Sequence, residues 1–184
     1  MTLPLLALSL LVSNPVQTAS SPLEIGVDTG ARMENGTQGM LALGLRLAYA
    51  PLEVFAIELE GAHLASSRGP ADKGGYTARG QLVGRIPAQF SPFVLVGGGA
   101  LGRPTEDEPE WAPSAHWGGG LDVEVLPAVR LRVQAKHVFA FETDGVRQDV
   151  ELMVGFGFGL FHEEARLAAS EALESTEVSQ VAAR

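Results

Sequence analysis

The sequence contains no cysteine among its 184 residues. Disulfide frameworks, thiol nucleophiles and Cys-ligated zinc sites are therefore excluded, as is anchoring through a lipidated N-terminal cysteine. Basic residues are also scarce, because 13 Lys and Arg stand against 22 Asp and Glu, for a net charge of −9. A protein that binds nucleic acid needs a basic surface for the phosphate backbone, so we expect no nucleic-acid partner.

The apolar run near the start of the chain, residues 3–12, is too short to cross a bilayer as a helix, which takes about 20 residues. Its length is typical of the hydrophobic region of a signal peptide, and small residues follow it. We therefore predict a cleaved signal peptide over residues 1–20, although no Lys or Arg precedes the run. The alternative is a buried apolar N-terminus.

No stretch between residues 22 and 161 has a sustained helical period, and short runs of alternating polarity take its place. These runs predict eight strands and an all-β fold: Leu23–Met33, Met40–Tyr49, Val54–His63, Tyr76–Ile86, Phe93–Gly102, His116–Val125, Arg130–Ala140 and Val150–Leu160. Short connections with proline alternate with longer polar ones. An up-and-down arrangement would place every long loop at one end and every short turn at the other.

Charge is absent from one face of the predicted strands. Alternate residues of a strand point to opposite sides, and Leu41, Leu43, Leu45 and Leu47 of the second strand share one side. The opposite side holds seven acids and six bases: Glu24, Asp28, Arg32, Arg46, Glu58, Glu60, Arg79, Arg85, Asp122, Glu124, Arg132, Lys136 and Glu151. The fifth predicted strand is apolar on both sides, so the sequence does not decide which of its sides belongs to the charged face.

Two closed sheets fit this pattern: a soluble barrel or sandwich with the apolar face inside, and a membrane barrel with that face outside. Glycine favours the membrane barrel, because a crowded lumen needs small residues between long charged ones. The charged face holds Gly26, Gly30, Gly44, Gly118, Gly120, Gly155 and Gly157. Aromatic residues lie towards strand ends, as expected at a membrane interface: Tyr49, Phe55, Tyr76, Phe93, Trp117, Phe139 and Phe158.

This pattern resembles the small eight-stranded outer-membrane β-barrels of Gram-negative bacteria, the OmpA-type transmembrane domain. "SPFVLVGGGALG", residues 91–102, is similar to the proline-led, glycine-rich strand of that family, and "VELMVGFGFGL", residues 150–160, resembles its closing strand. The resemblance implies an eight-stranded antiparallel up-and-down transmembrane barrel over residues 22–161, contact with outer-membrane lipids, and recognition of the closing strand by the barrel-assembly machinery. The closing-strand positions are Leu152, Val154, Phe156, Phe158 and Leu160.

The sequence departs from the family pattern after the closing strand, where we expect no peptidoglycan-binding domain. Residues 162–184 instead form an acidic Ala- and Glu-rich tail, for which we expect a short helix or disorder.

The charged face predicts a lumen filled by ion pairs. We expect five bases to pair with five acids across it: Arg46, Arg79, Arg85, Arg132 and Lys136 with Glu58, Glu60, Asp122, Glu124 and Glu151. Such a lumen leaves no wide channel, so bulk porin activity is not expected.

No catalytic, cofactor or metal site is predicted. The four histidines are dispersed, without metal-ligand spacing. A lipid-modifying enzyme of the outer membrane would need a lipid-facing histidine beside a serine, and the strand of His137 and the next strand offer none. We therefore expect a monomeric, non-enzymatic outer-membrane protein with a structural or surface-interaction role. The alternatives are a soluble secreted or periplasmic β-barrel that binds a small apolar ligand, and a lipid-modifying enzyme.

Overall fold

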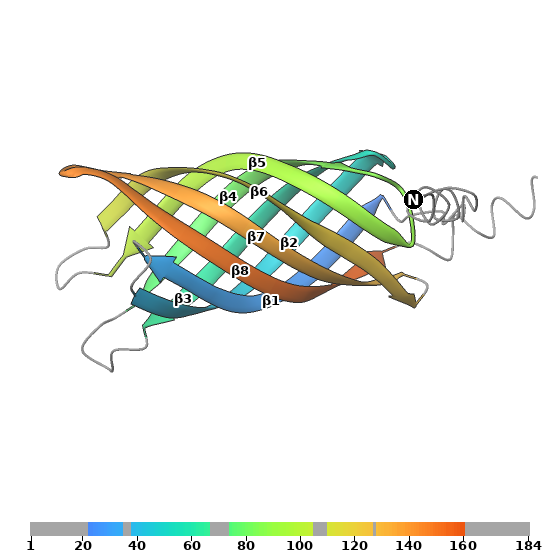
Figure 1. Ribbon diagram of the computed structural model, residues 1–184, viewed down its shortest axis with the longest axis horizontal. Helices are drawn as coiled ribbons and strands as arrows, with labels where there is room; N and C mark the ends of the chain where they lie inside the picture. Colours follow the sequence, from blue (N-terminus) through green and yellow to red (C-terminus); the bar gives the residue numbers. More distant parts are fainter. Residues whose placement is uncertain (1–21, 35–37, 67–73, 105–109, 127, 161–184) are drawn as a thin grey trace, which may run out of the picture.

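The computed structural model describes residues 22–34, 38–66, 74–104, 110–126 and 128–160. Eight strands form a closed barrel in chain order, and each pairs antiparallel with its neighbours (Figure 1). The strands are β1 (Leu23–Glu34), β2 (Gln38–Leu52), β3 (Phe55–Ser66), β4 (Gly75–Arg85), β5 (Phe90–Arg103), β6 (Glu110–Leu126), β7 (Val129–Glu142) and β8 (Gly145–Leu160). The prediction of an all-β, eight-stranded up-and-down barrel is confirmed.

The predicted signal peptide, residues 1–20, and the predicted tail, residues 162–184, lie outside the described residues. Within the described part of the chain, no helix is long and apolar enough to cross a membrane.

The strands are staggered around the barrel. Following paired residues from strand to strand leads from Glu24 back to β1 at Glu34, ten positions further along the same strand. Stagger and tilt are linked in a closed barrel, and Figure 1 shows the strands running obliquely. Residues far apart in the sequence therefore meet at one level of the interior.

Two strands begin well before their predicted starts at His116 and Val150. β6 begins at Glu110, and β8 begins at Gly145. Because Glu142 pairs with Gly145, the predicted long connection between β7 and β8 is a hairpin with a two-residue turn. The added segments are polar or contain proline, so their alternation is weak in the sequence. Pairing with β5 and β7 nevertheless extends them as strands.

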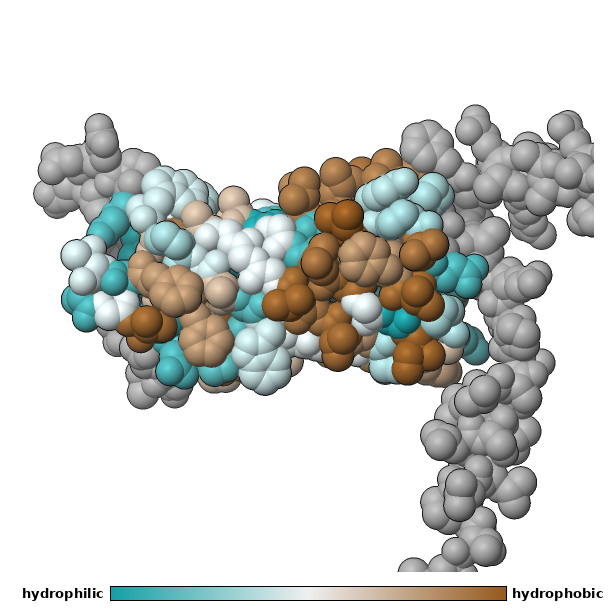
Figure 2. All heavy atoms as spheres, turned by 90° about the horizontal axis from the view of Figure 1, so that it is seen from above, coloured by the Kyte–Doolittle hydropathy of each residue, from teal (hydrophilic) through white to brown (hydrophobic). Residues whose placement is uncertain are grey.

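The outer surface of the barrel is apolar. Among the described strand residues, no Asp, Glu, Lys or Arg lies at an outward position. Large apolar side chains are instead exposed there, with Leu43 61%, Leu45 63% and Val94 69% exposed. In Figure 2 they form a brown region over the right half of the visible side. Such a surface needs an apolar environment, which a bilayer provides, and it contradicts the soluble barrel with its apolar face inside.

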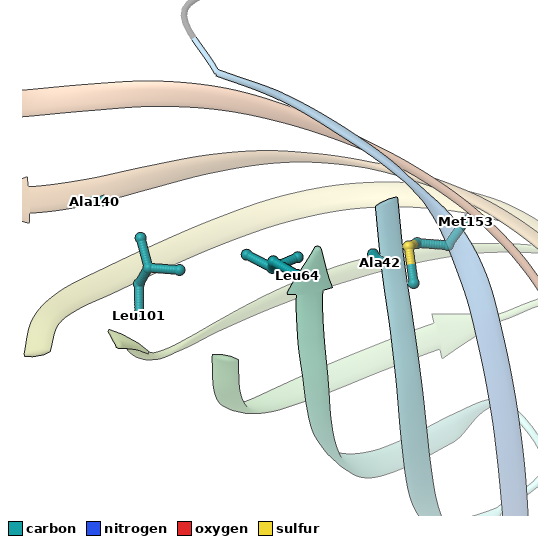
Figure 3. Packing of buried hydrophobic residues seen from close by; sticks show 5 residues of the cluster. All are labelled: Ala42, Leu64, Leu101, Ala140 and Met153. Carbon is teal, nitrogen blue, oxygen red and sulfur yellow. The ribbon is translucent and has the colours of Figure 1, made fainter. Parts of the chain in front are cut away.

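Two small apolar clusters lie inside the barrel. Figure 3 shows the first, which occupies the half towards the longer connections: Ala42, Leu64, Leu101, Ala140 and Met153. The second lies nearer the short turns and consists of Ala56, Val83, Phe93 and Leu95.

Phe93 shows which side of β5 points into the barrel. Its side chain points inward and is only 4% exposed, so the expectation that it belongs to the aromatic girdle is wrong. The physical reason is a buried cation, because the Arg132 guanidinium carbon lies 4.4 Å from the centre of the Phe93 ring.

Candidate functional site

The barrel interior is lined by charged side chains that pair across it. Of the ten side chains named from the sequence, all except Arg85 and Glu124 are buried and form ion pairs. The paired residues are Arg46, Glu58, Glu60, Arg79, Asp122, Arg132, Lys136 and Glu151. Burial of ions on this scale requires such pairing, since a lone buried charge is strongly unfavourable.

Arg132 of β7 is the centre of one group of ion pairs. Its Nε and Nη2 donate to the two carboxylate oxygens of Asp122 at 2.7 and 2.8 Å. Its Nη1 donates to both carboxylate oxygens of Glu58 at 2.9 Å. The amide of Gln81 donates to Glu58 at 2.7 Å. The planar guanidinium fork therefore joins β3, β6 and β7 with all three of its nitrogens bonded.

Glu151 of β8 is the centre of a second group. Arg79 donates to both of its oxygens, at 2.6 and 2.7 Å, and Arg32 Nη1 lies 3.2 Å from it. Arg79 also lies 3.7 Å from Glu60, which in turn pairs with Lys136. This chain of alternating charges crosses the lumen from β8 through β4 and β3 to β7.

Arg46 connects the first group to the N-terminal strand. Its Nη1 donates to Glu24 at 2.8 Å, and its Nε donates to Asp28 at 3.4 Å. Its Nη1 also lies 3.6 Å from Glu58. The acids of β1 and β3 thus share the guanidinium of Arg46 on β2.

Arg85 and Glu124 lie near the short turns, where both are only half-buried. Arg85 Nε donates to the backbone carbonyl of Glu53 at 3.0 Å. Within the described ranges, neither side chain takes part in an ion pair. Their partial exposure allows these two charges to remain solvated.

Sequence reasoning missed a further group at the end of the barrel with the longer connections. Arg147 contacts Glu142 at 2.7 Å, Asp149 at 3.1 Å and Glu34 at 3.5 Å, and Asp149 also pairs with Arg32. Arg147 and Asp149 were expected in a loop. Their spacing was a weak signal, since Arg147, Asp149 and Glu151 occupy alternate positions, although only Val150 of the two intervening residues is apolar.

Glycines on the inner face make room for these side chains. A Cβ placed at Gly26 would lie 2.6 Å from Nη2 of Arg46. A Cβ at Gly155 would collide with the Asp28 carboxylate and the backbone of β1, and one at Gly157 would collide with Glu24. The alternation of glycine and phenylalanine in β8 therefore places bulk towards the lipid and space towards the lumen.

Replacing Gly155 with Ala should lower the free energy of unfolding by about 1–3 kcal/mol, because the new methyl group overpacks the lumen against backbone. The matched control is Gly80→Ala on β4, where a Cβ has only a Leu59 methyl within contact distance, at 3.8 Å. We expect that variant to be neutral or slightly stabilising. Denaturant unfolding in lipid vesicles measures both, and equal effects would contradict the assigned role of Gly155.

The three described histidines, His63, His116 and His137, lie against aromatic rings or Gln81. His63 lies against the ring of Tyr76, and His137 lies between Trp117 and Phe139, with ring centres 4.4–6.0 Å apart. Inside the barrel, Nε2 of His116 lies 3.0 Å from the Gln81 oxygen. No serine or carboxylate is hydrogen-bonded to these rings within the described residues. In that part of the chain, no cluster of His, Asp and Glu is arranged to hold a metal ion.

The fold is similar to that of solved outer-membrane barrels. Neisserial surface protein A, NspA, superposes with a TM-score of 0.62 at 10% identity, over 77% of this chain and 99% of NspA. The N-terminal β-barrel domain of Pseudomonas aeruginosa OprF gives a TM-score of 0.55 at 12% identity, over 76% of this chain and 99% of that domain. No family model and no curated protein matches the sequence. The resemblance to small eight-stranded outer-membrane barrels is thereby confirmed for the fold.

Proposed function

We propose that the protein is an outer-membrane β-barrel of the Gram-negative cell envelope, with a structural or surface-interaction role. The observation that carries this proposal is the combination of an outer face without charged side chains and an inner face filled with paired ones. Only a closed barrel leaves no backbone edge unpaired in lipid, and all eight strands here are paired on both sides.

The closing strand supports insertion by the barrel-assembly machinery. Leu152, Val154, Phe156 and Phe158 are exposed on the outer face of β8, at 41–50%, and Leu160 ends the strand. In our proposal this apolar stripe is the segment that the machinery recognises. The mature protein is a monomer, because a closed barrel needs no second chain to complete its sheet.

The lumen supports a role without bulk conduction or catalysis. Ion pairs cross it at the level of Arg132 and Arg79, and the cluster around Leu64 and Leu101 adds an apolar layer. These side chains leave no wide aqueous path. Within the described residues, the histidines lie against aromatic rings or Gln81, and the role that we propose is non-enzymatic.

Cell fractionation combined with gel mobility tests the proposal. The protein should be recovered in the outer-membrane fraction, and the unboiled sample should migrate differently from the boiled sample, because a closed membrane barrel resists SDS until it is heated. Planar bilayers containing the purified protein should show no porin-sized conductance. Recovery in the soluble fraction without a mobility shift would refute the location, and large stable conductance would refute the closed lumen.

A further inference from the structure

The barrel wall opens between β6 and β7 at the end with the longer connections. Pairing of these two strands begins at Ser114 and Ala140. Beyond that point residues 110–113 pair only with β5, and residues 141–142 pair only with β8. A pocket of about 310 Å³ occupies the gap, lined by the ends of β5, β6 and β7 and by the β7–β8 turn. That volume lies in the range of small-ligand sites.

Two aromatic rings line this pocket. Trp111 and Phe141 are about half-exposed, at 51% and 49%. The Trp111 indole is held along β5 because Gly102 lacks a side chain there: a Cβ at Gly102 would lie 2.9 Å from two atoms of the ring. The pocket is therefore lined by two aromatic rings, and aromatic rings attract cations through the ring quadrupole.

The charges that line the pocket are mostly negative. Arg103 is its single base among the described residues, and it is shared by Glu34 at 3.3 Å and Glu142 at 3.7 Å. Glu110 and Asp144 also line the pocket, and within the described ranges neither forms an ion pair. The Arg103 guanidinium is thus already neutralised, while the carboxylates of Glu110 and Asp144 remain available to a ligand.

We propose that this pocket binds an organic cation, a primary ammonium or guanidinium group on a short apolar stem. The cationic head would lie between the carboxylates of Glu110 and Asp144, and the stem would lie against Trp111 and Phe141. An anionic ligand is disfavoured by the same carboxylates. The shared chemistry covers both a free amine and a basic side chain of a partner polypeptide. The inference goes beyond the proposed surface role by naming the ligand class.

The two tryptophans of the sequence allow a direct assay. In Trp117→Phe, the remaining indole is Trp111 in the pocket. In Trp111→Phe, the remaining indole is Trp117 on the outer face, 58% exposed. The folded barrel in detergent micelles is titrated with pentylammonium, with N-acetyl-lysine methylamide, and with pentanoate as the anion of similar length. Because the assay uses purified protein, its outcome is independent of the location of the barrel in the cell.

Both cationic probes should change Trp111 fluorescence saturably, and pentanoate should bind at least about tenfold more weakly. A saturable response to pentylammonium alone would assign the site to free amines, and a stronger response to the lysine amide would assign it to polypeptides. The inference is overturned if pentanoate is as effective as pentylammonium, or if Trp117 responds equally, which would indicate partition into micelles.

Glu110→Gln combined with Asp144→Asn should weaken cation binding by about fivefold to tenfold. The matched control is Glu53→Gln, which removes an exposed acid in the turn at the opposite end of the barrel and should leave affinity unchanged. Gly102→Ala keeps every charge but displaces the indole, so it should weaken binding as well. The heat shift in gel mobility verifies that each variant is folded. Unchanged affinity in the charge variant would overturn the site.

Discussion

Replacing Arg132 with Glu should lower the free energy of unfolding by about 3–5 kcal/mol or more, because it leaves buried carboxylates without their counter-charge. The wild-type guanidinium donates four hydrogen bonds to Asp122 and Glu58. In the variant, three carboxyl groups would face one another in a space that excludes water. We expect most molecules to lose the compact, SDS-resistant form.

Arg85→Glu is the matched control for Arg132→Glu. Arg85 lies on the same inner face, but its described side-chain contact is a single bond to the carbonyl of Glu53. A half-exposed charge of this kind contributes less than about 1 kcal/mol. The measurement is the temperature at which unboiled protein loses its compact mobility, together with denaturant unfolding in vesicles. Equal stability of the two variants would show that the Arg132 group does not support the barrel.

A variant in which Arg132 and both of its acidic partners are replaced by neutral residues separates the effect of charge on stability from the effect of packing. In Arg132→Met with Glu58→Gln and Asp122→Asn, no ion is left unpaired, so much of the lost stability should return. If this triple variant is as unstable as Arg132→Glu, the guanidinium supports the barrel through its shape and hydrogen bonds rather than by neutralising acids.

Leu45→Arg should make folding into a bilayer less favourable by about 2–4 kcal/mol, the cost of an arginine at the midplane of a membrane barrel. Leu45 is the middle residue of β2 and points outward, 63% exposed on the isolated protein. In water the same change would replace an exposed leucine by a solvated charge and would cost nothing comparable.

Leu52→Arg is the control for Leu45→Arg, with the same substitution on the same strand. Leu52 is the last residue of β2 and is 61% exposed. At that position the arginine reaches the interface and costs about 0–1 kcal/mol. Folding titrations in vesicles compare the two. Equal effects would contradict a bilayer around the middle of the barrel, whatever the stability of the fold.

The fold could be predicted because apolar and polar residues alternate without interruption along the part of each strand that has lipid on one side and the lumen on the other. Leu41 to Leu47 on one face and Arg46 on the other are placed by alternation alone. Prediction failed at the strand ends, beyond the region where an apolar outer face lies opposite a charged inner face. Glu110 and Gly145 begin strands beyond the apolar belt, where the alternation in the sequence is weak and pairing with a neighbouring strand decides the structure.

The pairing of lumenal charges could be predicted only in outline. Alternation indicates which side chains point inward, but the partner of each is set by the ten-residue stagger of the closed sheet. Arg79 therefore donates two hydrogen bonds to Glu151 across the lumen, although Glu60 of the neighbouring strand also lies 3.7 Å away. Phe93 faced inward for a similar reason, because its place against Arg132 depends on contacts between β5 and β7.

The seam between β1 and β8 has a consequence for the order of events during folding. Arg32 and Asp149, which are joined across it, are separated by 117 residues of chain. Contacts of such separation are slow to form, because the entropy of closing a long loop is lost before the contact is gained. Until β8 arrives, β1 has an unpaired edge that invites association with other chains. The time that passes before β8 closes the barrel is therefore the period in which this edge is open to aggregation.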